Sequence, residues 1–95
     1  ADITHYVEAP ALIARAEALA GAPLSLLVNN AGLHLKRATV EVDEAAFLDV
    51  LHVHVTAAHA LSRAVAPGML ARGAGHILFM ASMGALLGLP RASAY

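Results

Sequence analysis

The chain has no cysteine and no tryptophan, and it has few aromatic or charged residues. Without cysteine there is no disulfide framework, which is compatible with a cytoplasmic location. Only 14% of the 95 residues are charged, and the basic ones are scattered, so we expect neither nucleic acid nor a membrane surface as a partner. No apolar run reaches the roughly 18 residues of a membrane span, and no basic leader with a cleavage site is visible. We therefore expect a cytoplasmic protein.

Apolar residues are plentiful. They make up 59% of the chain, above the usual ~45–50%, and most are alanine, leucine and valine. A chain of this length buries only a modest share of its surface. The composition is therefore that of a buried part of an α/β protein.

Helical and strand patterns alternate along the chain. Pro10 in a first turn, apolar residues at helical spacing and a terminal Gly21 predict a helix over 8–20. The apolar runs at 24–28 and 77–81 predict buried parallel strands. Between them, Asp43 is a predicted N-cap of a long helix through Leu70. This order predicts an α/β fold with a Rossmann-like doubly wound parallel sheet that is partial, with about two to three strands and crossover helices.

Pro67 and Gly68 lie near the end of the long helical pattern. Proline lacks the backbone N–H that an interior helical position needs, and its ring clashes with the preceding turn. We therefore expect a kink or an end of the helix near these residues.

Polar residues follow both predicted strands where they end. Two amides and Ala-Gly occupy 29–32, Ser82 follows the second strand, and Tyr95 comes after a loop punctuated by glycine and proline. The carboxyl ends of parallel strands form the edge where ligands bind in open α/β sheets. Ala-Gly lets a planar ligand approach the main chain closely. By itself, however, the segment 29–32 is more often an ordinary strand-to-loop turn.

Together these residues resemble the short-chain dehydrogenase/reductases, nicotinamide-dependent oxidoreductases with a Rossmann fold. The features that match in order are Asp2-Ile3, Asn-Asn-Ala-Gly at 29–32, Ser82, and Tyr95 thirteen residues later. The resemblance implies that residues 1–95 form a partial NAD(P)-binding Rossmann domain. It also implies that the glycine-rich N-terminal part and the segment after the catalytic tyrosine lie outside this sequence.

The resemblance implies a cofactor site for NAD or NADP, which the sequence does not distinguish. Asp2 is expected to contact the adenine amine and Ile3 the adenine ring through its backbone. Asn30, Ala31 and Gly32 are expected on the adenine-ribose side, with Asn29 tying strands together. Tyr95 is expected at both the cofactor and the reacting atoms.

The resemblance also implies roles in catalysis. Ser82 would orient the carbonyl or hydroxyl of a small alcohol or ketone, and Tyr95 would be the general acid or base. A phenol has an ordinary pKa near ~10, about three units above neutrality, a gap of roughly 4 kcal/mol. The family closes this gap with a lysine four residues after the tyrosine, a position beyond Tyr95 here. We therefore expect little turnover from these 95 residues alone.

His54 stands where the family usually has an asparagine that holds a water in a proton relay. An imidazole also accepts and donates protons, so His54 is either part of such a relay or a tolerated substitution. Leucines near the predicted crevice hint at an apolar substrate, and they are equally typical of packing: Leu33, Leu35, Leu86 and Leu87.

Other functions fit the sequence less well. His52, His54 and His59 do not have the i, i+4 spacing that binds a metal ion, so no metal site is expected. Ser82 lacks the Gly-x-Ser-x-Gly context of a hydrolase nucleophile. The main alternative is a catalytically silent fragment that serves as an interaction surface. The long helix is the expected contact in a homo-oligomeric parent protein, by resemblance to the family.

Overall fold

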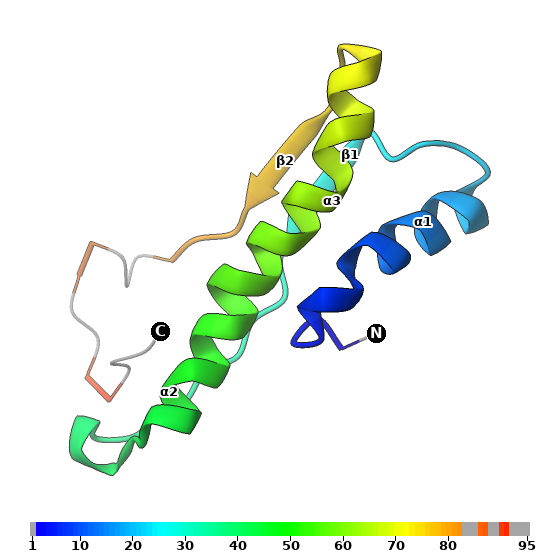
Figure 1. Cartoon of the computed structure of the whole chain (residues 1–95). Helices are drawn as coiled ribbons and strands as arrows, with labels where there is room; N and C mark the ends of the chain where they lie inside the picture. Colours follow the sequence, from blue (N-terminus) through cyan, green and yellow to red (C-terminus); the bar gives the residue numbers. More distant parts are fainter. Residues whose placement is uncertain (1, 83–85, 88–89, 92–95) are drawn as a thin grey trace.

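The structure is a computed structural model that describes residues 2–82, 86–87 and 90–91. Three helices and two strands dominate it (Figure 1). In chain order they are α1 (Ala9–Ala20), β1 (Leu26–Asn29), α2 (Glu44–Leu51), α3 (Ala57–Arg72) and β2 (His76–Phe79). A π-helical turn at His52–Thr56 joins α2 to α3, and 3₁₀ turns lie at Tyr6–Glu8 and Thr39–Glu41.

β1 and β2 are parallel neighbours, paired from Leu26 opposite His76 to Asn29 opposite Phe79. The α2–α3 helix crosses over from one strand to the other, and α1 packs beside α3 (Figure 1). This arrangement confirms the α/β prediction of a partial Rossmann-like sheet, with two strands in the part of the chain that the structure describes.

The core lies between the sheet and the helices. Ile13 of α1 meets Val65 and Met69 of α3, and Leu27 and Ile77 of the strands pack against this cluster. Side chains alternate across a strand, so Leu26, Val28 and Leu78 lie on the opposite face of the sheet and are about half exposed. Among the described residues, the helices therefore cover one face of the sheet.

α1 has the predicted ends: Pro10 lies in its first turn, and Gly21 ends it with a left-handed φ of 69°. Both strands are shorter than predicted and shifted. β1 begins at Leu26, because its pairing with β2 begins there, and Ser25 accepts a bond from the amide of His76. β2 ends at Phe79 rather than at residue 81, because its partner β1 ends opposite it at Asn29.

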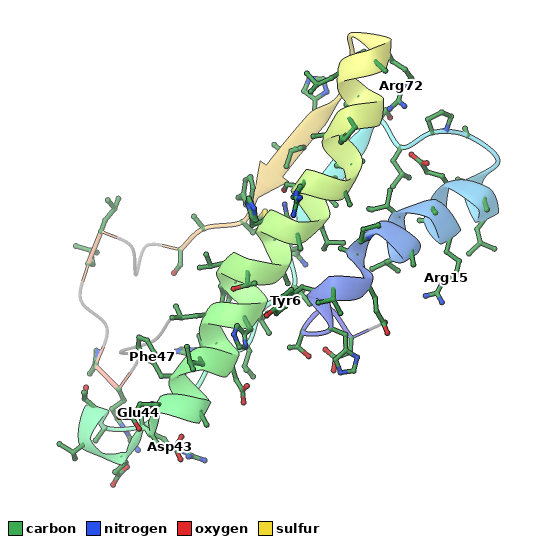
Figure 2. The ribbon with its side chains drawn as sticks, in the orientation of Figure 1. Tyr6, Arg15, Asp43, Glu44, Phe47 and Arg72 are labelled. Atoms are coloured by element: carbon green, nitrogen blue, oxygen red, sulfur yellow. The ribbon has the colours of Figure 1, made fainter. Side chains whose placement is uncertain are left out.

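The long helix begins as predicted, with the carboxylate of Asp43 accepting a bond of 2.8 Å from the amide of Ala46. Pro67 and Gly68 do not end it, since α3 continues to Arg72. Pro67 lies on an exposed side, where water can bond to the carbonyl that loses its partner. Arg72 lies at the end of α3 (Figure 2). It donates a bond to the carbonyl of Leu24, which fixes this end of α3 against the segment that enters β1.

Irregular helix geometry occurs instead at His52–Thr56, where the amide of Ala57 donates to the carbonyl of His52. A bond across five residues widens the helix by one residue in that turn. The sequence pattern did not predict this turn, because apolar residues continue at helical spacing through it, at Leu51, Val55 and Ala58.

Substitution by alanine should destabilise the protein much more at Gly75 than at Gly68. A Cβ on Gly75 would overlap the side chain of Met69, which is confined in the core. We expect Gly75→Ala to destabilise the protein by about 1–3 kcal/mol. A Cβ on Gly68 would lie 3.1 Å from the Arg72 guanidinium, which is bonded to the Leu24 carbonyl. The gain in helix propensity and the cost of shifting Arg72 then oppose each other, so the control Gly68→Ala should change the stability by less than about 1 kcal/mol. Thermal unfolding checks both, and an equal loss of stability in the two variants would contradict this packing.

Candidate functional site

A hollow of about 150 Å³ lies at the carboxyl end of β1. Its walls come from the segment after β1, the π-helical turn, α3 and the end of β2. Four of the predicted site residues line it: Ile3, Asn30, Ala31 and His54. The hollow thus lies at the edge where ligands bind in parallel sheets.

Asn29 fixes the strand that leads into this hollow. Its side-chain amide donates to the carbonyl of Leu78 at 3.3 Å and to the hydroxyl of Ser62 at 3.4 Å. The bond to Leu78 ties β1 to β2, as predicted for Asn29, and the bond to Ser62 also ties β1 to α3. The amide oxygen of Asn29 is buried and has no hydrogen-bond partner among the described residues. The wall of the hollow therefore contains a buried acceptor that lacks a donor among the described residues.

His54 contacts the main chain of the loop after β1. Its Nε2 lies 2.9 Å from the carbonyl oxygen of Leu33 and 3.2 Å from the amide nitrogen of Leu33. The loop lies so close that a Cβ on Gly32 would be 3.1 Å from the ring carbon Cε1. Glycine at this position therefore allows the ring and the loop to pack together.

Asp2 lies apart from this hollow. It lines a second one of about 330 Å³, beside the 3₁₀ turn and the start of α1, and Ile3 borders both. The exposed carboxylate of Asp2 accepts bonds from the hydroxyl of Thr4 at 2.7 Å and from its amide at 2.9 Å. These two bonds hold the pKa of Asp2 below its ordinary value.

Ser82 is half-buried and lies three residues beyond the end of β2. Tyr95 lies outside the described residues. Three residues at the site were not predicted from the sequence. Ser62 is the hydrogen-bond partner of Asn29, and Phe79 and Met80 line the hollow. The sequence predicts Phe79 and Met80 as buried strand residues. For Ser62, a serine within a helix, the sequence does not indicate which residue it contacts.

Neither a metal centre nor a membrane span is found in the residues that the structure covers. No group of three histidine or acidic side chains there could hold a metal ion. Among the described helices, none is long and apolar enough to cross a membrane.

Known proteins match this chain over its whole length. The family model for short chain dehydrogenases matches residues 1–95, the whole chain. The chain belongs to this family. Galactitol 2-dehydrogenase (L-tagatose-forming) of Cereibacter sphaeroides is 40% identical over 97 residues, covering 100% of the chain. The 5-keto-D-gluconate 5-reductase of Escherichia coli K12 is 36% identical over 87 residues, covering 92% of the chain.

Solved structures of short-chain dehydrogenases share the fold. The gluconate 5-dehydrogenase of Burkholderia cenocepacia, solved with NADP and tartrate, superimposes with a TM-score of 0.90 at 26% identity. That match covers 100% of this chain and 37% of the other. The chain also spans 37% of the galactitol enzyme and 34% of the keto-gluconate enzyme, so it corresponds to about a third of these relatives.

The two Thr4 bonds predict a pH effect with a definite sign. Because they lower the folded pKa of Asp2, they stabilise the fold at neutral pH, and this contribution is lost as the pH falls through the folded pKa. We expect Thr4→Val to raise the Asp2 pKa towards its ordinary value, and Thr39→Val, in the other 3₁₀ turn, to leave it unchanged. Carboxyl ¹³C titration measures both. An Asp2 pKa unaffected by Thr4→Val would refute the assignment.

Proposed function

We propose that the protein is an NAD(P)-dependent oxidoreductase that interconverts an alcohol and a carbonyl. One observation carries the proposal. The loop after β1, Ile3 and His54 converge on a hollow at the carboxyl edge of a parallel sheet, in a chain of the short chain dehydrogenase family. In open α/β sheets this edge is where dinucleotides bind.

The residues present fit the adenine-ribose part of NAD or NADP. Ile3, Asn30 and Ala31 line the hollow, and Gly32 keeps the adjoining main chain free of a side chain. The buried amide oxygen of Asn29 offers an acceptor for an amine or hydroxyl. Asp2 would contribute from the neighbouring hollow through the carboxylate oxygen that Thr4 does not use. When bound, the nicotinamide group would accept or supply a hydride.

For catalysis we propose that the Tyr95 phenol moves the proton on the substrate oxygen and also contacts the cofactor. The Ser82 hydroxyl would hold the same oxygen by a hydrogen bond. Removing a proton from an alcohol, or adding one to a carbonyl, must accompany transfer of the hydride. His54, which lines the hollow and contacts the loop after β1, is proposed at this site as well.

The proposed substrate is a small alcohol or ketone. Two similar enzymes are named for galactitol and for 5-keto-D-gluconate, which supports a small polyhydroxylated compound. Leu33, Leu86 and Leu87 expose apolar surface in segments beyond the strands, and this supports an apolar portion of the substrate.

A second candidate is a catalytically silent protein that acts through association. A relative from Xanthobacter autotrophicus, 35% identical over 95 residues, is named an inactive 2-(S)-hydroxypropyl-CoM dehydrogenase 2. The long helix exposes large apolar side chains that could pack against another copy: Phe47, Leu48, Val55 and Leu70. A homo-oligomer through this helix is compatible with either candidate.

The test uses the protein expressed from its whole gene, assayed with NADH, NADPH and a panel of ketoses and keto acids. We expect Tyr95→Phe to lower kcat/KM by about 10²–10⁴-fold, because the general acid or base is lost. The matched control, Tyr6→Phe, changes the phenol that packs against His52 and should retain activity. Ser82→Ala should also lower kcat/KM. If the protein binds neither cofactor yet oligomerises, the silent candidate replaces the enzyme.

A further inference from the structure

One ring nitrogen of His54 faces two opposite hydrogen-bonding groups. The carbonyl oxygen of Leu33 needs a donor and its amide needs an acceptor, yet both point to Nε2, at 2.9 Å and 3.2 Å. A neutral imidazole nitrogen either has a hydrogen and donates or lacks one and accepts. His54 can therefore make only one of these two bonds at a time.

The surrounding structure fixes the ring at this place. His54 lies at the centre of the π-helical turn, between the buried Val53 and the buried Ala57 and Ala58. The Tyr6 ring, labelled in Figure 2, packs against His52 of the same turn, with ring centroids 5.8 Å apart. Gly32 adds no side chain that would separate the loop from the ring. The loop and the ring thus stay in contact while the hydrogen bond has two alternatives.

We propose that His54 is a positioning residue whose tautomer sets the loop at 29–33 in one of two states. The shorter of the two distances is to the carbonyl oxygen, which favours the tautomer with hydrogen on Nε2. Leu33 is 43% exposed, so water can bond to whichever of its groups His54 releases. The cost of changing state is therefore small, because the released group does not remain unsatisfied.

This role rests on the proposed function, since the loop that His54 holds would bind the cofactor. Asn30 and Ala31 line the hollow, and Leu33 follows them directly in the loop. A changed bond at Leu33 is transmitted through Gly32 to their main chain. We therefore expect changes at His54 to alter cofactor affinity, whereas loss of a proton relay would lower the rate of the chemical step.

Two substitutions at His54 separate these roles in the protein expressed from its whole gene. His54→Asn supplies a separate donor and acceptor, so both Leu33 groups can be bonded at once. His54→Ala supplies neither. His59→Asn on the exposed side of α3 is the matched control, because His59 does not line the hollow.

The first readout is independent of activity. Hydrogen exchange at the Leu33 amide should be about fivefold to tenfold slower in His54→Asn than in the parent protein, from one added hydrogen bond. His54→Ala and His59→Asn should not slow it. Long-range ¹H–¹⁵N spectra of the parent should show hydrogen on Nε2. Equal Leu33 exchange in the parent and in His54→Asn would overturn the one-bond-at-a-time model.

The second readout is cofactor binding against turnover. We expect His54→Ala to raise the Kd for the preferred cofactor about tenfold, with kcat at saturating cofactor changed less than about twofold, and His54→Asn to restore the Kd. A fall in kcat with an unchanged Kd would overturn the positioning role and favour a relay. If neither cofactor binds the parent protein, the proposed function fails and so does the link to affinity. Hydrogen exchange at the Leu33 amide and the ¹H–¹⁵N spectra of His54 would still test whether the contact between His54 and Leu33 has two states.

Discussion

The parallel register of β1 against β2 is the constraint on which the rest depends. With Leu27 opposite Ile77, both side chains reach the helices, and Asn29 falls opposite Phe79 at the end of the pairing. A slip of one residue would turn every side chain to the other face of the sheet. It would take Leu27 out of the core and the Asn29 amide away from Ser62. The register therefore determines both the core and the edge where the candidate site lies.

Beyond the end of the strands, hydrogen bonds from side chains, rather than bonds between strands, fix the position of the loop after β1. Asn29 bonds to β2 and α3 at the last paired residue, and four residues later His54 bonds to the backbone of Leu33. Between these two contacts, Asn30, Ala31 and Gly32 are exposed. A loop held at both ends and open in the middle presents main-chain groups to a ligand without collapsing onto the helix.

Much of this could be predicted from the sequence, because it depends on local chemistry. Gly21 ends α1 and Asp43 caps α2, since each needs only its own turn. The apolar runs that precede the segment 29–32 and Ser82 predict that both follow strands. The ends of the strands are harder to predict, because a strand ends where its pairing with its partner ends. β2 ends at Phe79, opposite Asn29, and nothing in the local sequence marks this position.

The missed features depend on contacts between distant residues. The bond from Asn29 to Ser62 spans 33 positions, and that from His54 to Leu33 spans 21. The π-helical turn at His52–Thr56 is likewise not apparent from the sequence, because apolar residues continue at helical spacing through it. The resemblance identified His54 as the unusual residue of the helix. Its partner became apparent only when the fold brought the two segments together.

The position of His54 shows how one substitution can preserve packing and change chemistry. An amide has a donor and an acceptor on separate atoms, so it can satisfy both backbone groups of one residue at the same time. An imidazole offers a single atom towards the loop, and the choice of group then depends on its tautomer. Because the tautomer is set by the bonds around the ring, the loop becomes coupled to the environment of the π-helical turn. A histidine at this position therefore retains the contact with the loop, but which group of Leu33 is bonded depends on the tautomer of the ring.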